Sequence, residues 1–129
     1  LFNTHYQDSA GLLDDGDYTT PIDLARLASV AIKNSEFVKI ISTKNKIITD
    51  ITAQNIYNLS NLNKLLGTNG VYGVKTGYTE EAGQVLVTSK LENGHTIIVV
   101  VMLSNDRFLD TERLLNLVTG NINYLSIRP

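Results

Sequence analysis

Apolar residues recur at helical spacing early in the chain. Thr20-Pro21-Ile22-Asp23 combines a hydroxyl that can cap a helix, a proline suited to the first helical position and a carboxylate three residues on. The apolar residues that follow predict a helix from about Pro21 to Ile32, and a shorter one from Glu36 to Ile41. The segment before them, Leu1 to Tyr18, is rich in turn-forming residues and reads as an irregular surface loop.

A second helical pattern closes the chain. Asn105 or Asp106 can cap this long helix. Two stripes follow along it, which we interpret as a face packed on a sheet. One stripe is Phe108, Leu115 and Ile122, and the other is Thr111, Val118 and Leu125.

Between the helices the pattern changes to β-rich runs. Thr43 to Leu59 has the Ile and Thr content of strands, although its alternation is poor. Gln84 to Leu91 and Thr96 to Leu103 flank an Asn-Gly connector, which is a strong signal for an antiparallel hairpin. The continuous apolar run from Ile97 to Val101 predicts a central strand buried on both faces. The order of elements predicts an α+β fold in which helices pack on an antiparallel sheet.

The composition narrows the class of protein. The 129 residues, 43% of them hydrophobic, suffice for one domain or a large part of one. A formal net charge of −2 gives no basic field, so we predict no nucleic-acid partner. Without cysteine there is no disulfide and no thiolate metal site, and an extracytoplasmic location stays open. No signal-peptide pattern begins the chain, and Leu1 is not a start methionine. We therefore interpret the chain as a processed or truncated piece of a longer protein.

The main chemical candidate is Lys75-Thr76-Gly77, within Gly70 to Thr79. Read as an edge strand, this segment sends Lys75 and Gly77 to one face and Thr76 to the other. A residue without a side chain marks a place where a ligand or backbone comes close, and an exposed edge can receive an extended peptide. A three-residue match carries little weight alone, so its flanks matter.

The flanks resemble one protein family over nearly the whole chain. Gly73 to Gly83 resembles the strand and following turn of the serine D-alanyl-D-alanine carboxypeptidases, the low-molecular-weight penicillin-binding proteins of bacterial cell walls. Asn61 to Leu66 resembles their Asn-Thr-Asn-Lys-Leu-Leu segment, and Asn3 to Tyr6 with Gly11-Leu12 resembles the stretch before the first helix. The resemblance implies part of the β-lactamase/transpeptidase-like fold and, for the parent protein, a serine-type carboxypeptidase.

The signature of that fold is Ser-x-x-Lys, then Ser-x-Asn, then Lys-Thr-Gly, and this chain has only the third motif. No serine is followed by lysine three residues later or by asparagine two residues later. In the family these motifs lie upstream. The resemblance therefore implies that residues 1–129 are the C-terminal part of a catalytic domain whose nucleophile-bearing N-terminal part is absent, and that the fragment alone is inactive.

The resemblance also implies roles for individual residues. Lys75 lies beside the active serine and supplies positive potential and hydrogen bonds. The Thr76 hydroxyl binds the terminal carboxylate of the substrate, Gly77 lets the peptide lie against the strand, and the Tyr78 backbone N–H is one donor to the oxyanion. Arg107, at the start of the last helix, is the candidate for a second substrate-binding cation, with Arg113 as the alternative by sequence. No metal or cofactor is implied.

The partners that the resemblance implies are peptidoglycan stem peptides ending in D-Ala-D-Ala, β-lactam antibiotics and the missing N-terminal part of the same domain. The implied location is the cell envelope, with a secreted and membrane-associated parent. Two alternatives remain open. One is a non-catalytic cell-wall peptide-binding or interaction module of the same fold, and the other is a β-lactamase.

Other polar residues carry weaker signals. His5 has no visible serine or cysteine pairing and is interpreted as structural, and His95 is expected in a solvated hairpin turn. Asp14, Asp15 and Asp17 lack the twelve-residue spacing and the closing glutamate of a calcium loop.

Overall fold

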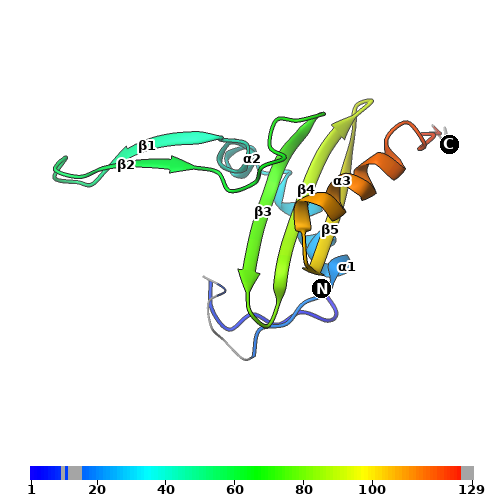
Figure 1. The fold of residues 1–129 in the computed structure, drawn as a ribbon, viewed down its shortest axis with the longest axis horizontal. Helices are drawn as coiled ribbons and strands as arrows, with labels where there is room; N and C mark the ends of the chain where they lie inside the picture. The colour runs from blue at the N-terminus through cyan, green and yellow to red at the C-terminus, as the bar shows by residue number, and fades with distance from the viewer. Residues whose placement is uncertain (10, 12–15, 126–129) are drawn as a thin grey trace.

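Helices and strands alternate along the chain in an α+β order. The computed structural model describes residues 1–9, 11 and 16–125. Within these residues the elements are α1 (Pro21–Ala31), α2 (Ser35–Ile41), β1 (Asn45–Thr49), β2 (Ile56–Ser60), β3 (Val71–Thr79), β4 (Gly83–Glu92), β5 (His95–Ser104) and α3 (Arg107–Val118). Figure 1 shows α3 across the near face of a three-stranded sheet and α1 behind it. The predicted fold class is confirmed.

The central layer is an antiparallel sheet in the order β3–β4–β5. β4 and β5 are joined by Asn93-Gly94, whose φ angles of 51° and 79° are those of the left-handed turn that an Asn-Gly connector favours. β3 lies at one edge of the sheet, as predicted, and no other strand in the described part of the chain pairs with that edge. The edge of β3 is therefore available to an extended peptide.

The prediction of a central strand at Ile97 to Val101 is wrong for the residues that the structure describes. β5 lies at the second edge of the sheet, and β4 is the middle strand. Both faces of β5 are nevertheless covered, because α1 packs on one face and α3 on the other (Figure 1). This double coverage accounts for the continuous apolar run, since alternation is needed only where one face meets water.

The helix starts lie where the sequence predicted them. Thr20 Oγ1 accepts from the backbone N–H of Asp23 at 3.3 Å, so it caps α1. Asn34 caps α2 through two backbone N–H groups, and Asp106 caps α3 in the same way. These caps fix where each helix begins, including the start of α3 beside the candidate site.

The closing helix is shorter than predicted. It ends at Val118, Thr119 is extended, and Gly120 follows with a φ of 72°, a left-handed conformation that commonly ends helices. Ile122 and Leu125 therefore lie beyond the helix, and Leu125 is 87% exposed. The apolar stripe in the sequence continues past Gly120, whereas the helix itself ends before this glycine.

The hydrophobic core joins β3 to α3. Its buried side chains come from all three sheet strands, from α3 and from the segment before β3, and they are Leu65, Val71, Leu86, Val99, Val101 and Leu115. Phe108, the first apolar residue of α3, packs against this cluster. Burying an aliphatic side chain of this size stabilises by roughly 1.5–3 kcal/mol before entropy. The core thus holds the start of α3 against the sheet.

A two-stranded hairpin extends to one side of the sheet (Figure 1). β1 and β2 pair antiparallel from Asn45 opposite Ser60 to Thr49 opposite Ile56. All residues of both strands are exposed. The strand content predicted for Thr43 to Leu59 is confirmed, with residues 50–55 forming the loop between β1 and β2.

The first residues of the chain are fixed on α1 by a buried carboxylate. Asp23 is 1% exposed and accepts from the N–H groups of Phe2 at 3.0 Å and Asn3 at 2.7 Å, and from the Thr4 hydroxyl at 2.9 Å. Hydrogen bonding, first from Asn3, holds the pKa of Asp23 below its ordinary value. The segment predicted to be an irregular loop therefore begins with an anchored stretch.

Candidate active site

The Lys-Thr-Gly segment occupies the C-terminal half of β3. Lys75 is exposed, Thr76 is 9% exposed, Gly77 is half-buried and Tyr78 is exposed. This alternation agrees with the expected division of Lys75 and Thr76 between the two faces. Lys75 Nζ contacts the carbonyl oxygen of Thr76 and forms no ion pair with a carboxylate of the described residues. Its positive charge is therefore available at an open strand edge.

Two asparagines fix the segment Asn61 to Leu66, called the braced segment here, and one of them binds β3. Asn63, which is buried, donates through Nδ2 to the carbonyl of Gly73 at 3.4 Å, and its Oδ1 accepts from the N–H of Leu65 at 3.1 Å. Asn61 donates to the carbonyl of Ile41 at 3.3 Å, which connects the same segment to the end of α2. Sequence reasoning assigned these residues no role. The Asn-x-Asn spacing ahead of a strand was the only signal of this brace.

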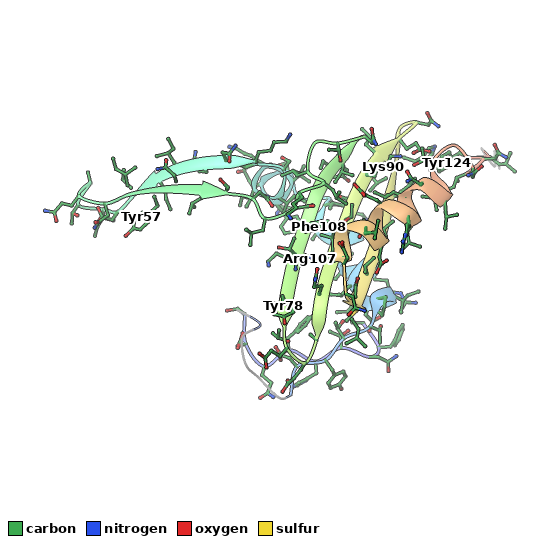
Figure 2. The ribbon with its side chains drawn as sticks, viewed as in Figure 1. Tyr57, Tyr78, Lys90, Arg107, Phe108 and Tyr124 are labelled. Carbon is green, nitrogen blue, oxygen red and sulfur yellow. The ribbon has the colours of Figure 1, made fainter. Side chains whose placement is uncertain are left out.

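Arg107 lies across the end of β3. Its Nη1 donates to the carbonyl oxygen of Gly77 at 2.7 Å, and its backbone N–H donates to Gln84 Oε1 at 3.3 Å. Its Nε is buried and has no hydrogen-bond partner among the described residues. In Figure 2, Arg107 at the start of α3 lies between Tyr78, near the end of β3, and Phe108. The guanidinium is thus fixed beside Gly77 at the end of β3.

The structure separates the two arginines that the sequence left as alternatives. Arg107 contacts the Lys-Thr-Gly strand, whereas Arg113 pairs with Asp110 at 3.5 Å on the same helix, and its side chain is 68% exposed. Lys75, Thr76, Gly77, Tyr78 and Arg107 therefore come together at one end of the sheet. Arg113 does not join them.

An open groove of about 590 Å³ continues from this end of the sheet. It is lined by Leu62, Lys64, Tyr78, Gln84, Asn105, Asp106, Arg107 and Phe108. The groove therefore lies between the braced segment, the end of β3 and the start of α3. Its position lets a ligand that follows the edge of β3 extend past Tyr78.

The remaining polar candidates stay outside this site. His5 pairs with Tyr18 through backbone hydrogen bonds, and His95 is exposed and stacks on Tyr124 with ring centres 3.7 Å apart. Asp17 accepts from the backbone N–H of Gln7, while Asp14 and Asp15 lie outside the described residues. Within the part of the chain that is described, no three His, Cys, Asp or Glu residues gather as metal ligands, and no helix is long and apolar enough to span a membrane.

A protein-family model matches most of the chain. Residues 1–106 match the model of peptidase family S11, D-alanyl-D-alanine carboxypeptidase. The chain belongs to this family. The match includes the braced segment and the Lys-Thr-Gly strand of the S11 chain, and it ends at the cap of α3.

Curated relatives agree with the assignment to family S11. The D-alanyl-D-alanine carboxypeptidase of Streptomyces sp. strain K15 is 33% identical over 124 residues, which are 90% of this chain and 43% of the relative. DacF of Bacillus subtilis strain 168 is 33% identical over 102 residues, which are 78% of this chain and 26% of the relative. The S11 chain therefore spans less than half the length of these relatives.

Solved structures show the same partial coverage. A mutant of the Streptomyces K15 DD-transpeptidase superposes with a TM-score of 0.86 and 34% identity, covering 93% of this chain and 49% of that one. Penicillin-binding protein D2 from Listeria monocytogenes in its cefotaxime-bound form gives a TM-score of 0.73 and 29% identity, covering 88% of this chain and 47% of that one. The S11 chain has the DD-peptidase fold over the part it shares with these proteins.

Proposed function

We propose that this chain forms the substrate-side wall of the active site of a serine D-Ala-D-Ala carboxypeptidase, which trims peptidoglycan stem peptides and is acylated by penicillin. The observation that supports this most directly is the hydrogen bond from Arg107 to the carbonyl of Gly77. It sets a guanidinium at the end of an open strand edge that carries Lys75-Thr76-Gly77. A peptide with a terminal carboxylate fits such an edge.

In this proposal the stem peptide extends along β3 and its terminal carboxylate meets the Thr76 hydroxyl and Arg107. A charge-assisted hydrogen bond of this kind contributes about 1.5–3 kcal/mol. Two unit charges 4 Å apart attract by about 4 kcal/mol at an effective dielectric near 20, before desolvation. The carboxylate therefore fixes which end of the peptide enters the site.

The reacting carbonyl lies one residue inward from that carboxylate. The backbone N–H of Tyr78 donates to the oxyanion that develops there, and Lys75 supplies positive potential nearby. Gly77 presents no side chain to the peptide. These groups stabilise negative charge and position the substrate, but none of them is a nucleophile.

The nucleophile belongs, in this proposal, to the N-terminal part of the same catalytic domain, which is not in this chain. Acyl transfer needs a serine hydroxyl that an adjacent base deprotonates, because a neutral serine is a poor nucleophile. The serine attacks the carbonyl carbon, the terminal D-Ala leaves as the amine, and water then hydrolyses the acyl-enzyme. The parent acts outside the cytoplasm in the cell envelope, where peptidoglycan lies, and its chemistry uses no metal or cofactor.

The test is covalent labelling of the parent protein with a fluorescent penicillin, followed by an assay of D-Ala release from a D-Ala-D-Ala peptide. We expect labelling and release. A folded parent that resists labelling and releases no D-Ala would support a non-catalytic peptide-binding module. Rapid turnover of penicillin without D-Ala release would instead indicate a β-lactamase.

A further inference from the structure

The groove at the end of β3 carries a second cation that the proposed function has not used. Lys64 lines this groove with Arg107, and both cations lie over the same aromatic ring. Lys64 Nζ is 5.4 Å from the centre of the Phe108 ring, and the Arg107 guanidinium carbon is 5.1 Å from it. At these distances the ring attracts both cations and keeps each of them at the groove that they line.

The backbone of Lys64 is fixed on both sides. Its neighbours Asn63 and Leu65 are each 5% exposed, and the N–H of Leu65 donates to Asn63 Oδ1 at 3.1 Å. Asn63 also donates to the carbonyl of Gly73 on β3. The braced segment therefore presents Lys64 to the groove from a position that is tied to the Lys-Thr-Gly strand.

The charge of Lys64 is not neutralised within the described residues. It forms no ion pair there, and the acidic residue that lines the groove is Asp106. Asp106 Oδ1 already accepts from the N–H groups of Phe108 and Leu109, both at 3.1 Å, as the cap of α3. The groove therefore has two cationic side chains and one carboxylate that is engaged in helix capping. Its balance favours an anionic ligand.

We propose that Lys64 is a specificity-determining residue that acts with Arg107 to select peptides whose last residue carries a free carboxylate. This inference rests on the proposed function, because it adds a group to the same site. Arg107 takes the carboxylate in a fixed geometry, since it is bonded to Gly77. Lys64, on a longer and exposed stem, approaches the same carboxylate from the other wall of the groove and acts as a point charge.

A purely structural role for Lys64 predicts different behaviour. If its charge only holds the braced segment to Phe108, its loss lowers the melting temperature and slows every substrate alike. If it binds the carboxylate, its loss affects only substrates that have one. The ratio of kcat/KM for a peptide ending in D-Ala-D-Ala to kcat/KM for the matching C-terminal carboxamide separates the two roles.

The experiment compares Lys64→Met with Lys64→Arg in the parent enzyme. Lys46→Met is the matched control, because it removes the same charge from an exposed position on β1. We expect Lys64→Met to lower the carboxylate-to-carboxamide ratio about threefold to fivefold, as for a partly exposed charge pair. Lys64→Arg retains most of the ratio, and Lys46→Met leaves it unchanged. In the wild type, raising the salt concentration lowers the same ratio.

Each result bears on one claim. An unchanged ratio in a folded Lys64→Met enzyme overturns the role of Lys64 but leaves the proposed function standing, provided that fluorescent penicillin still labels the enzyme. A parent that penicillin does not label overturns the proposed function itself. If Lys64→Met does not fold, Lys64→Gln replaces it, and a wild-type ratio that does not respond to salt also overturns the inference.

Discussion

The two arginines at the start and middle of α3 differ in what they contact. Arg107 reaches Gly77 on β3, whereas Arg113 is exposed and pairs within its own helix. We expect Arg107→Gln in the parent to lower kcat/KM for D-Ala release about tenfold to a hundredfold, because a charge-assisted hydrogen bond is lost. Arg113→Gln is the control, and equal effects of the two substitutions would contradict the assignment of Arg107.

The two glycines of β3 predict opposite effects of alanine. A Cβ on Gly77 would have Val85 Cβ as its nearest neighbour, at 3.7 Å, which is an ordinary contact. A Cβ on Gly73 would lie 2.5 Å from Ile41 Cδ1 and 3.1 Å from Ser89 Oγ, so the packing would have to shift. The first position tolerates a methyl group in the fold, and the second does not.

We therefore expect Gly77→Ala to leave the melting temperature of the parent nearly unchanged while slowing its acylation by penicillin, since the methyl group occupies the approach of the peptide. Gly73→Ala should destabilise by about 1–3 kcal/mol, the usual range for overpacking. Thermal melts and labelling rates check both. Normal acylation in a folded Gly77→Ala enzyme would remove the close-approach role of this glycine.

At the scale of elements, a buried ion pair ties the end of α3 to the β4–β5 hairpin. Lys90, whose side chain is 6% exposed, contacts the Glu92 carboxylate and the Thr119 hydroxyl. Glu92 also accepts from the N–H of Gly120 at 2.9 Å. These contacts lie just beyond the last turn of α3, at the opposite end of the helix from Arg107. They fix the C-terminal end of α3 on the sheet.

The ion pair makes stability depend on pH. The Lys90 ammonium, with the Gly120 N–H, holds the pKa of Glu92 below its ordinary value. Since the folded-state pKa is the lower one, the stabilisation is complete above the unfolded pKa of about 4.3 and is lost as pH falls through the folded-state pKa. We expect the melting temperature to fall as the pH drops below about 5. Part of this fall should disappear in Glu92→Gln.

The same substitution also tests the pair at neutral pH. Glu92→Gln leaves the buried Lys90 without its carboxylate, so it should lower the melting temperature by several degrees. Glu80→Gln, at an exposed turn position after β3, is the control and should change neither the melting temperature nor its pH profile. If the two variants have the same melting temperature, the pair of Lys90 and Glu92 does not stabilise the attachment of α3 to the sheet.

Much of the element structure follows from local signals. The caps at Thr20, Asn34 and Asp106 and the Asn-Gly turn are local hydrogen-bonding and backbone preferences, which a sequence displays directly. The edge position of β5 is not local, because an apolar run reports coverage of both faces and says nothing about pairing. The predicted helix is too long because the apolar stripe continues beyond Gly120, and the stripe does not show that this glycine ends the helix.

The candidate site also combines features that the sequence displays with contacts that only the folded chain creates. The Lys-Thr-Gly strand is contiguous, so its residues could be singled out in the sequence. The choice between Arg107 and Arg113 required the contact with Gly77, which lies thirty residues earlier. The brace of Asn63 on Gly73 and the shared ring of Lys64 and Arg107 are also tertiary contacts. The Asn-x-Asn spacing hints at the first of these contacts, and no spacing in the sequence specifies the second.

At the scale of the whole molecule, the chain spans less than half the length of the relatives with which it was compared. If the proposed function holds, the isolated 129 residues should remain unlabelled by fluorescent penicillin under conditions that label the parent. Intact-mass analysis of both samples checks this. A covalent adduct on the isolated chain would show that a nucleophile within these residues had been overlooked.

The hydrogen bond from Arg107 to Gly77 also bears on where a bound polypeptide can be cut. That bond holds the positive charge of the guanidinium at the end of the strand, and a polypeptide backbone offers an opposite charge only at its C-terminus. A segment from the middle of a polypeptide would bring no backbone carboxylate to this cation and would have to pass the guanidinium. If the proposed function holds, the strand edge favours removal of a last residue over internal cleavage, although the same edge can pair with any extended backbone.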